Sequence, residues 1–273
     1  MCGIFGIHYK QLDNIQKNKV LFDLRLFSKL SLSRGQDTFG LAFSKNNNEY
    51  IYKVNTHPLN AFKRKDFNEF INPIFENLSE LKSFSAIGQT RLVTNGTKFL
   101  SENNQPILTK NLIGVHNGII VDNKKTFFSK QNQEGYNIKS DSLILFEELS
   151  ENFEKNKDNF FDSYEKYLTD IDGNYSIAFR IPNLKMNFLS SNCGSLYYFK
   201  TNNFLVFASE NTILKNFVLK SKLKLNIKDL EIKKILNEII VYDDDLNFID
   251  KNKINKKKFN LQKNNFKIFD NIS

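Results

Sequence analysis

The chain begins with Met1-Cys2-Gly3-Ile4-Phe5-Gly6-Ile7, and this stretch decides how the rest of the sequence is interpreted. Cys2 follows a methionine that methionine aminopeptidase removes when the next side chain is small. Removal would leave a thiol and a free α-amine on one residue, and that amine, with a pKa of roughly 7.7–8.0, can act as a general base. Taken alone, the stretch also fits a buried strand with a chance cysteine, so the remaining motifs must decide.

Composition limits the class of protein. The chain has 273 residues, of which 40% are apolar, enough for one large domain or a domain with an appendage. Its two cysteines, Cys2 and Cys193, form no disulfide framework, and the three histidines lie far apart, so we expect no metal and no cofactor. No apolar run approaches the ~18 residues of a membrane span. With no signal-peptide pattern either, we predict a cytoplasmic protein.

The positive charge is concentrated at one end. The net charge is +9, and residues 251–273 contain seven lysines and one aspartate. Such a tail can contact nucleic acid, anionic lipid or an acidic partner, or can simply keep the chain in solution. Because the rest of the chain has no basic-aromatic surface motif, nucleic acid is not an expected partner.

The hydrophobic pattern predicts an α+β fold. Strands are followed by helices and then by a run of strands, which suggests two antiparallel sheets packed face to face with helices outside. Asn117-Gly118 is a strong turn signal, so 112–121 is predicted as a hairpin-like pair of short strands. The expected helices are 14–32, 58–81, 141–155, 158–171 and 210–217, and the expected strands are 2–10, 38–44, 49–54, 84–91, 174–181, 185–190, 196–200, 204–208 and 238–242.

One polar segment is predicted to be functional. Residues 92–106 are rich in Thr, Asn and Gly and are too long for a tight turn. Loops of this length that lack secondary structure usually carry function. The segment follows Arg91, which ends an alternating strand.

Seven short motifs, in order, resemble the glutaminase domain of class II, N-terminal-nucleophile (Ntn) glutamine amidotransferases. They cover roughly residues 2–245. The resemblance implies a four-layer α-β-β-α sandwich of two antiparallel sheets, the Ntn hydrolase fold. The motifs are Cys2-Gly3-Ile4-Phe5-Gly6, Arg34-Gly35-Gln36-Asp37-Thr38-Phe39-Gly40, Gly88-Gln89-Thr90-Arg91-Leu92-Val93-Thr94-Asn95-Gly96, His116-Asn117-Gly118, Ser140-Asp141-Ser142, Gly173-Asn174-Tyr175 and Phe207-Ala208-Ser209-Glu210.

The resemblance assigns the catalytic roles. Cys2 would attack the side-chain amide carbon of L-glutamine and form a thioester, with its own α-amine carrying the proton to the departing ammonia. The Asn117 side-chain amide and the Gly118 N–H would stabilise the oxyanion. Losing one such donor typically costs about 100–1,000-fold in rate.

The same resemblance assigns the substrate-binding roles. Arg91 would hold the α-carboxylate of glutamine in bidentate geometry, and Asp141 would hold the α-ammonium. A surface salt bridge and helix capping are the structural alternatives for these two residues. Thr94 and Gly96 would add contacts to the carboxylate, and Arg34 would support the N-terminus or the wall of the site. The loop 92–104 is expected to close over bound glutamine.

Three positions depart from the family pattern without removing a residue that the chemistry requires. Gln89 stands where the family often has His, at a strand position expected to tolerate the change. Leu143 replaces a common Glu, and Asn95 replaces a His of the sugar-phosphate members. The branch of the family is therefore left open.

The sequence also predicts the domain organisation. We expect a glutaminase domain over 2–245 and a basic C-terminal extension over 246–273, partly disordered. No phosphate-loop, pyrophosphate-loop or dinucleotide motif is present in the sequence. The resemblance therefore implies a glutaminase subunit that passes ammonia to a separate synthase partner.

Two alternatives remain at this stage. The chain could be a catalytically silent regulatory or scaffold subunit with the same fold, although retention of the motif residues argues against this. It could also be an Ntn hydrolase of another amide, although the pairing of Arg91 with Asp141 suits a free amino acid.

Overall fold

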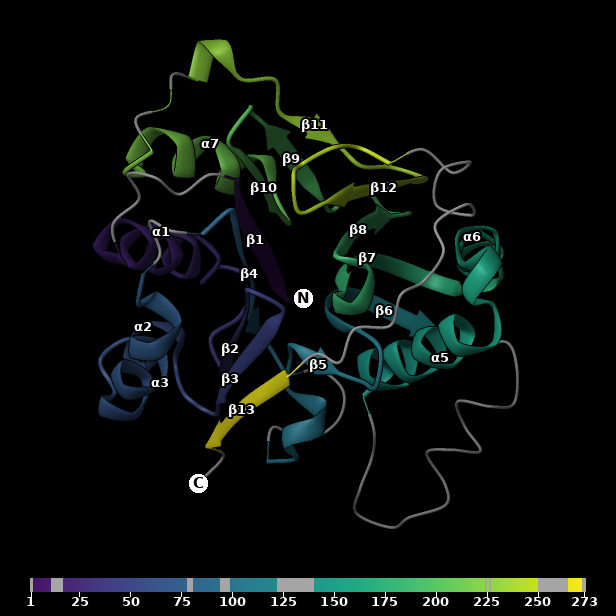
Figure 1. Ribbon diagram of the computed structural model, residues 1–273, viewed down its shortest axis with the longest axis horizontal. Helices are drawn as coiled ribbons and strands as arrows, with labels where there is room; N and C mark the ends of the chain where they lie inside the picture. Colours follow the sequence, from purple (N-terminus) through teal and green to yellow (C-terminus); the bar gives the residue numbers. More distant parts are fainter. Residues whose placement is uncertain are drawn as a thin grey trace.

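The computed structural model shows four layers, helix–sheet–sheet–helix (Figure 1). Two sheets face each other, and each is covered by helices on its outer face. This arrangement confirms the predicted α-β-β-α architecture. The structure describes residues 2–10, 17–77, 81–93, 99–121, 140–223, 225, 227–249 and 265–271.

The first sheet has eight strands in the order β11-β9-β10-β1-β4-β2-β3-β13. Strand β1 lies inside it, antiparallel to both β10 and β4. The other pairs are also antiparallel, except that β13 runs parallel to β3 at the edge. The strands are β1 (Gly3–Lys10), β2 (Thr38–Lys45), β3 (Asn48–Val54), β4 (Ser83–Arg91), β9 (Tyr197–Lys200), β10 (Phe204–Ala208), β11 (Lys233–Lys234) and β13 (Asn265–Asn271).

The second sheet has five strands in the order β12-β8-β7-β6-β5, all antiparallel. Its centre is the long pairing of β6 with β7, from Ile113 opposite Arg180 to Val121 opposite Asp172. The strands are β5 (Ile107–Leu108), β6 (Ile113–Val121), β7 (Asp172–Ile181), β8 (Met186–Ser191) and β12 (Glu238–Asp243).

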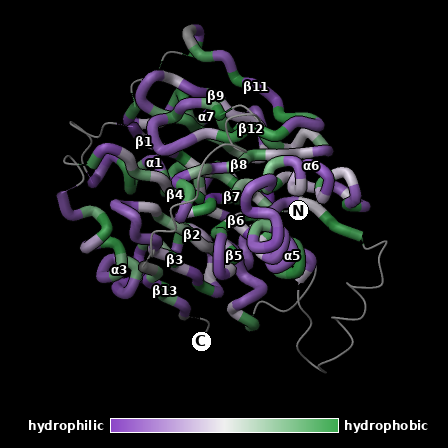
Figure 2. Tube along the Cα trace, turned by 45° about the vertical axis from the view of Figure 1, so that its right-hand side comes forward, coloured by the Kyte–Doolittle hydropathy of each residue, from purple (hydrophilic) through white to green (hydrophobic). Residues whose placement is uncertain are grey.

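The helices form the two outer layers. α1, α2, α3 and α7 pack on the first sheet, and α5 and α6 pack on the second (Figure 1). Hydrophobic and hydrophilic residues are interleaved along the chain trace, as amphipathic helices covering a sheet require (Figure 2). The helices are α1 (Lys17–Leu30), α2 (Pro58–Ala61), α3 (Lys65–Phe75), α5 (Asp141–Lys155), α6 (Phe160–Asp170) and α7 (Asn211–Lys220), with 3₁₀ turns η2 (Ser101–Asn103), η3 (Lys157–Asn159), η4 (Pro182–Leu184) and η5 (Ile227–Asp229).

Strand alternation divides the core into layers. Phe5 and Tyr9 of β1 point to the helices of the first sheet, whereas Ile4 points to the second sheet and packs with Val115 and Leu205. The layer between the sheets is apolar at its centre. At both ends it carries buried polar side chains, including Arg91 and Asn117 at one end and His8 and Arg180 at the other. These two polar ends are described below.

Two predictions about local structure were wrong. Residues 112–121 do not form a hairpin, because 113–121 is the single strand β6 and Asn117-Gly118 lies within it. Nine consecutive pairs with β7 outweigh the local turn preference. The predicted helix 58–81 is two helices, α2 and α3. Asn77, with a φ of +52°, follows the end of α3.

The predicted C-terminal extension contains a strand. Within 246–273, Asn265–Asn271 forms β13 at the edge of the first sheet, next to β3 (Figure 1). The boundary of the glutaminase domain at residue 245 stays a prediction. Among the described residues, no helix is both long and apolar enough to cross a membrane.

Candidate functional site

Cys2 links the two sheets at the start of β1. Its backbone N–H donates to Asn117 Oδ1 of β6 at 3.0 Å, so the first sheet is hydrogen-bonded to the second at this point. The Cys2 thiol is half-buried, and its Sγ lies 3.9 Å from the carbonyl oxygen of Leu92. The candidate nucleophile is therefore held between the end of β4 and the middle of β6.

Buried polar contacts anchor this end of the chain. Arg34 Nε donates to the Cys2 carbonyl oxygen at 2.9 Å, and Arg34 Nη1 forms a 2.6 Å ion pair with Glu210. Ser209 Oγ accepts from the N–H of Ile4 at 2.9 Å. Arg34 thus contacts the N-terminal residue itself. Residues from two further sequence motifs, Arg34 in one and Ser209 and Glu210 in the other, thus meet at the start of β1.

Opposing effects act on the Cys2 thiol. Burial raises its pKa, while the hydrogen bond to the Leu92 backbone and the positive charge of Arg91 partly offset that effect. Asp141 acts on the same thiol and raises its pKa further. Both charged residues expected to bind an amino acid therefore lie close enough to influence the sulfur.

Arg91 ends β4 and is buried. Its Nη1 donates to Asn104 Oδ1 at 2.6 Å, and burial lowers the pKa of the guanidinium. Asp37 fixes the backbone around it, because the Asp37 N–H donates to the Arg91 carbonyl at 2.9 Å and Asp37 Oδ2 accepts from the N–H of Val93 at 2.8 Å. The strand end that carries Arg91 also positions the Leu92 carbonyl beside Cys2.

Asp141 is the first residue of α5. Ser140 supplies the helix cap, with its Oγ accepting from the Leu143 N–H at 3.2 Å. Asp141 Oδ1 accepts from the Ser142 N–H at 2.8 Å, and its Oδ2 accepts from the Ile120 N–H at 3.2 Å. A helix N-terminus favours an acidic side chain, and Asp141 stands in the first turn of α5. It also ties α5 to β6 two residues beyond Gly118.

Asn117 and Gly118 occupy adjacent positions on β6. Because the Asn117 oxygen accepts from Cys2, its amide NH₂ is the part of the side chain that can donate to an oxyanion. Gly118 has a φ of +156°, and a Cβ there would lie 1.9 Å from the Asn174 carbonyl oxygen. Only glycine fits at this position without moving β7.

Several supporting residues were missed by the sequence prediction. Gln89 Nε2 donates to the His116 carbonyl at 3.0 Å, and Gln105 Oε1 accepts from the His116 N–H at 2.6 Å. His116 Nδ1 lies 2.9 Å from Ser142 Oγ, and burial lowers the pKa of its imidazole. These contacts fix the backbone directly before Asn117. The sequence held one clue to them: Gln89 departs from the family pattern, and the position was expected to tolerate that change. In the structure the Gln89 side chain has a specific partner, the His116 carbonyl.

The structure gathers six predicted site residues at one end of the sheet interface: Cys2, Arg34, Arg91, Asn117, Gly118 and Asp141. Thr94 and Gly96 lie outside the described residues, as does part of the predicted loop 92–104. Within the described part of the chain, no cluster of three or more His, Cys, Asp or Glu side chains could hold a metal ion.

Comparisons with known proteins point to one family of enzymes. A family profile described as a glutamine amidotransferase domain matches residues 89–216. The glutamine–fructose-6-phosphate aminotransferase (isomerizing) of Buchnera aphidicola subsp. Acyrthosiphon pisum (strain APS) is 27% identical over 197 residues, which are 71% of this chain and 29% of that protein. The chain therefore matches less than a third of this relative.

Two solved structures share the fold. The B. subtilis glutamine phosphoribosylpyrophosphate amidotransferase, complexed with ADP and GMP, aligns with a TM-score of 0.57 and 18% identity over 92% of this chain and 49% of its own. A structure described as the allosteric regulatory enzyme of purine biosynthesis aligns with a TM-score of 0.59 and 18% identity, over 89% of this chain and 47% of its own. Residues 89–216 thus match the glutamine amidotransferase domain family, and the chain has the N-terminal-nucleophile fold of these two structures.

Proposed function

We propose that the chain hydrolyses L-glutamine to glutamate and ammonia, with Cys2 as the nucleophile after removal of Met1. The observation that carries this proposal is the hydrogen bond from the Cys2 nitrogen to Asn117 Oδ1, at a point where Arg91 and Asp141 both act on the thiol. After processing, the same oxygen would hold the free α-amine of Cys2. A nucleophile and its base would then be fixed on one residue.

The reaction proceeds through a thioester. The amine takes the proton from Sγ while the sulfur attacks the side-chain amide carbon of glutamine. Collapse of the tetrahedral intermediate breaks the C–N bond, and the proton passes to the departing nitrogen, which leaves as ammonia. Water then attacks the thioester, which releases glutamate and restores the thiol.

Two donors on β6 stabilise the oxyanion in this proposal. They are the Asn117 amide NH₂ and the Gly118 N–H. The hydrogen-bonded backbone of His116 holds both donors in place before substrate arrives. Donors that are already oriented stabilise developing charge without reorganising during the reaction.

The substrate is recognised by its two charged groups. Arg91 binds the α-carboxylate, since a guanidinium matches a carboxylate in bidentate geometry. Asp141 binds the α-ammonium from the N-terminus of α5. We assign Thr94 and Gly96 to the carboxylate side, on a loop that closes over glutamine. A simple amide without both groups would bind more weakly, which favours glutamine over another amide substrate.

We also propose that the ammonia passes to a separate synthase. Three exposed apolar side chains lie close in sequence to site residues: Leu92 is 44% exposed, Ile119 53% and Val121 54%. Exposed apolar groups around a site are typical of protein interaction surfaces. Glutamine-dependent synthesis by the partner should require this chain, whereas synthesis from added ammonium should not. Equal glutamine dependence without this chain would exclude the partnership.

Labelling of Cys2 tests the glutaminase proposal most directly. A diazoketone analogue of glutamine should add once to a chain lacking Met1, and excess L-glutamine should prevent the addition. The Cys2→Ala variant should give neither adduct nor glutamate, whereas the control variant Cys193→Ser should retain both. A processed Cys2 that does not react would instead support the catalytically silent alternative.

A further inference from the structure

The layer between the two sheets has a second polar end, away from Cys2. Cys2 precedes β1, whereas His8 lies near its other end, six residues away and therefore roughly 20 Å along an extended strand. Five side chains at this end face the opposite sheet or the space between the sheets: His8, Ser44, Glu49, Ser85 and Arg180. The candidate glutamine site uses none of them.

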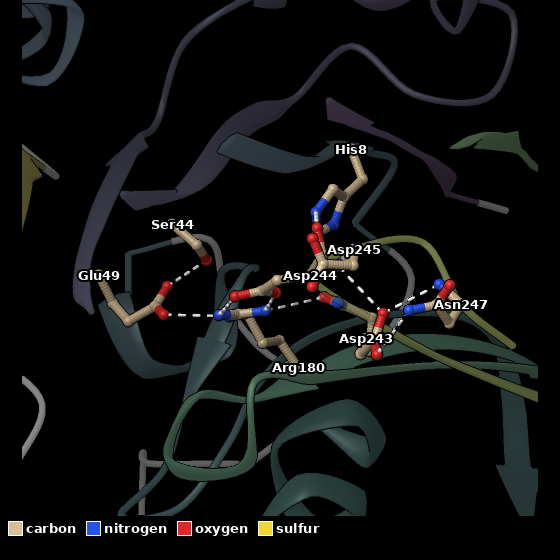
Figure 3. Close-up of polar contacts among 9 residues, drawn as sticks. His8, Ser44, Glu49, Arg180, Asp243, Asp244, Asp245 and Asn247 are labelled. Carbon is tan, nitrogen blue, oxygen red and sulfur yellow. Dashed lines mark hydrogen bonds and ion pairs between the residues drawn. The ribbon is translucent and has the colours of Figure 1, made fainter. Parts of the chain in front are cut away.

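Arg180 of β7 is the centre of this end (Figure 3). Its Nε lies 3.1 Å from Glu49 of β3, and its Nη1 and Nη2 lie 2.5 and 3.0 Å from the two carboxylate oxygens of Asp244. Glu49 also accepts a hydrogen bond from Ser44. These paired charges hold Arg180 rigidly in the interface between the sheets.

A network of this kind can be purely structural, but a cavity opens beside it. The cavity has a volume of about 380 Å³, within the range of pockets that bind small molecules. Four cationic side chains and one carboxylate line it, together with His8 and small polar groups. The charged residues are Lys45, Lys82, Lys185, Arg180 and Asp244. Because Arg180 is already paired with Glu49 and Asp244, the three lysines supply the excess of positive charge, which suits an anionic ligand.

His8 lies on the inner wall of this cavity. The side chain is only 2% exposed, and its Nε2 lies 3.2 Å from the carbonyl oxygen of Asp244, so Nε2 must carry the hydrogen. Burial lowers the pKa of His8 to about 4, which keeps the ring neutral and makes Nδ1 an acceptor. Within the described residues, His8 Nδ1 has no hydrogen-bond partner.

A second buried polar atom at this end also lacks a partner. Asn187 lies beside Arg180 but does not line the cavity, and its Nδ2 donates to no group among the residues that the structure describes. Buried polar atoms are almost always hydrogen-bonded, so each exception requires an explanation. Water alone could satisfy one such atom, but it would not account for the excess of positive charge.

We propose that this cavity, which we call the far-end pocket, is a binding site for a small phosphorylated metabolite. The phosphate group would lie between Lys82 and Lys185 at the rim, and the rest of the ligand would fill the cavity beside His8. The volume admits more than a phosphate ion, which favours a phosphate monoester. The site is separate from the glutamine site and does not depend on the proposed glutaminase activity.

Titration calorimetry on the full chain tests the far-end pocket. The probes are inorganic phosphate, a hexose monophosphate, sulfate and citrate. We expect saturable 1:1 binding, tightest for the hexose monophosphate and weaker for inorganic phosphate. Tighter binding of sulfate or citrate would overturn the assignment to a phosphate ester. Absence of saturable binding by every probe would overturn the site itself.

Paired variants locate the binding. Lys82 and Lys185 are exposed at the rim, so the double variant K82Q/K185Q should fold normally and weaken binding about tenfold or more. Lys45 is left unchanged because it already donates to the carbonyls of Pro73 and Glu76. The variant K166Q/K215Q removes the same charge from exposed helix positions and should bind as the parent does. Equal weakening in both variants would indicate a general charge effect and contradict the proposal.

NMR provides a second readout that does not depend on affinity. The chain has three histidines, so their imidazole signals are few and can be assigned with single His→Gln variants. Addition of the hexose monophosphate should shift the His8 signals and leave those of His57 and His116 unchanged. An unchanged His8, or a shift of His116 alone, would place the ligand elsewhere.

Discussion

Asn117 is the residue on which the proposed chemistry depends most, because its amide has two roles. The oxygen holds the Cys2 nitrogen, and the NH₂ group is left to face a developing oxyanion. Asn117→Ala removes both contacts. We expect kcat for glutamine hydrolysis to fall about 100–1,000-fold with a smaller change in KM. Steady-state kinetics check this, with the exposed Asn202→Ala as the control. A variant that changed KM alone would assign Asn117 to substrate binding.

At the scale of residues, the sequence could predict the side chains that we propose to touch substrate but not the ones that hold them. Cys2, Asn117 and Asp141 stand in recognisable motifs. By contrast, Asn104 and Glu210 received no role, because their contacts with arginine side chains form only when distant segments meet. A local pattern contains no information about such pairs.

At the scale of elements, periodicity predicted most helices and strands. The prediction for α5 matched the observed bounds, and the failure at β6 shows the limit of local signals. Asn-Gly favours a tight turn in a short peptide. In the folded chain, a continuous ladder with β7 determines the conformation, and glycine is required for its close approach to Asn174.

The packing of α1 against the segment after α7 gives a prediction about pH. Asp23 of α1 is fully buried, and its Oδ1 accepts from the Lys222 N–H at 3.0 Å. Burial raises the pKa of Asp23 from 3.8 to about 6. A carboxyl whose pKa is higher in the folded state stabilises the fold below its unfolded pKa, and this stabilisation is lost as the pH rises through about 6.

The variant Asp23→Asn removes this titration. Between pH 4 and pH 8, the free energy of unfolding of the parent should therefore fall by up to about 3 kcal/mol relative to that of the variant. Urea unfolding at each pH measures this difference. The exposed Asp158→Asn is the control and should follow the parent at every pH. Parallel curves for the parent and Asp23→Asn would show that Asp23 does not titrate in this range.

A buried lysine connects the first sheet to the Arg91 side of the site. Lys53 of β3 is 6% exposed, and its Nζ donates to the Ser101 carbonyl of η2 at 3.1 Å. The same turn leads to Asn104, which binds Arg91. Lys53→Met should therefore raise KM for glutamine severalfold and leave kcat nearly unchanged, because it disturbs the clamp and not the nucleophile. The exposed Lys166→Met should have no effect, and a loss of kcat alone would contradict this role.

At the scale of the whole molecule, one architecture supports two polar ends. The apolar centre of the sheet interface holds the two sheets together. The two ends of the interface contain charged side chains, which would be too costly to bury without partners in the apolar centre. One end contains the proposed glutamine site, and the other contains the far-end pocket. Alternation along β1 places Ile4 at the centre and His8 at the far end of the same face.

The C-terminal strand β13 packs against the edge of the first sheet, next to β3. Phe269 of β13 stacks on Tyr52 with ring centroids 5.1 Å apart and also contacts Phe70, whereas the neighbouring Ile268 is 56% exposed. The charge pattern alone suggested a solvated tail over this region. The structure instead indicates that one face of β13 contributes to the core.

Replacing one side chain on each face of β13 by alanine tests whether this strand stabilises the fold. Phe269→Ala should lower the free energy of unfolding by about 1–3 kcal/mol, less than a fully buried Phe would cost, because the ring is only half-buried. Ile268→Ala changes the opposite face of the same strand and should cost less than about 0.5 kcal/mol. Urea denaturation of both variants measures the difference. Equal, small effects would mean that β13 contributes little to stability and that the sheet is complete at β3.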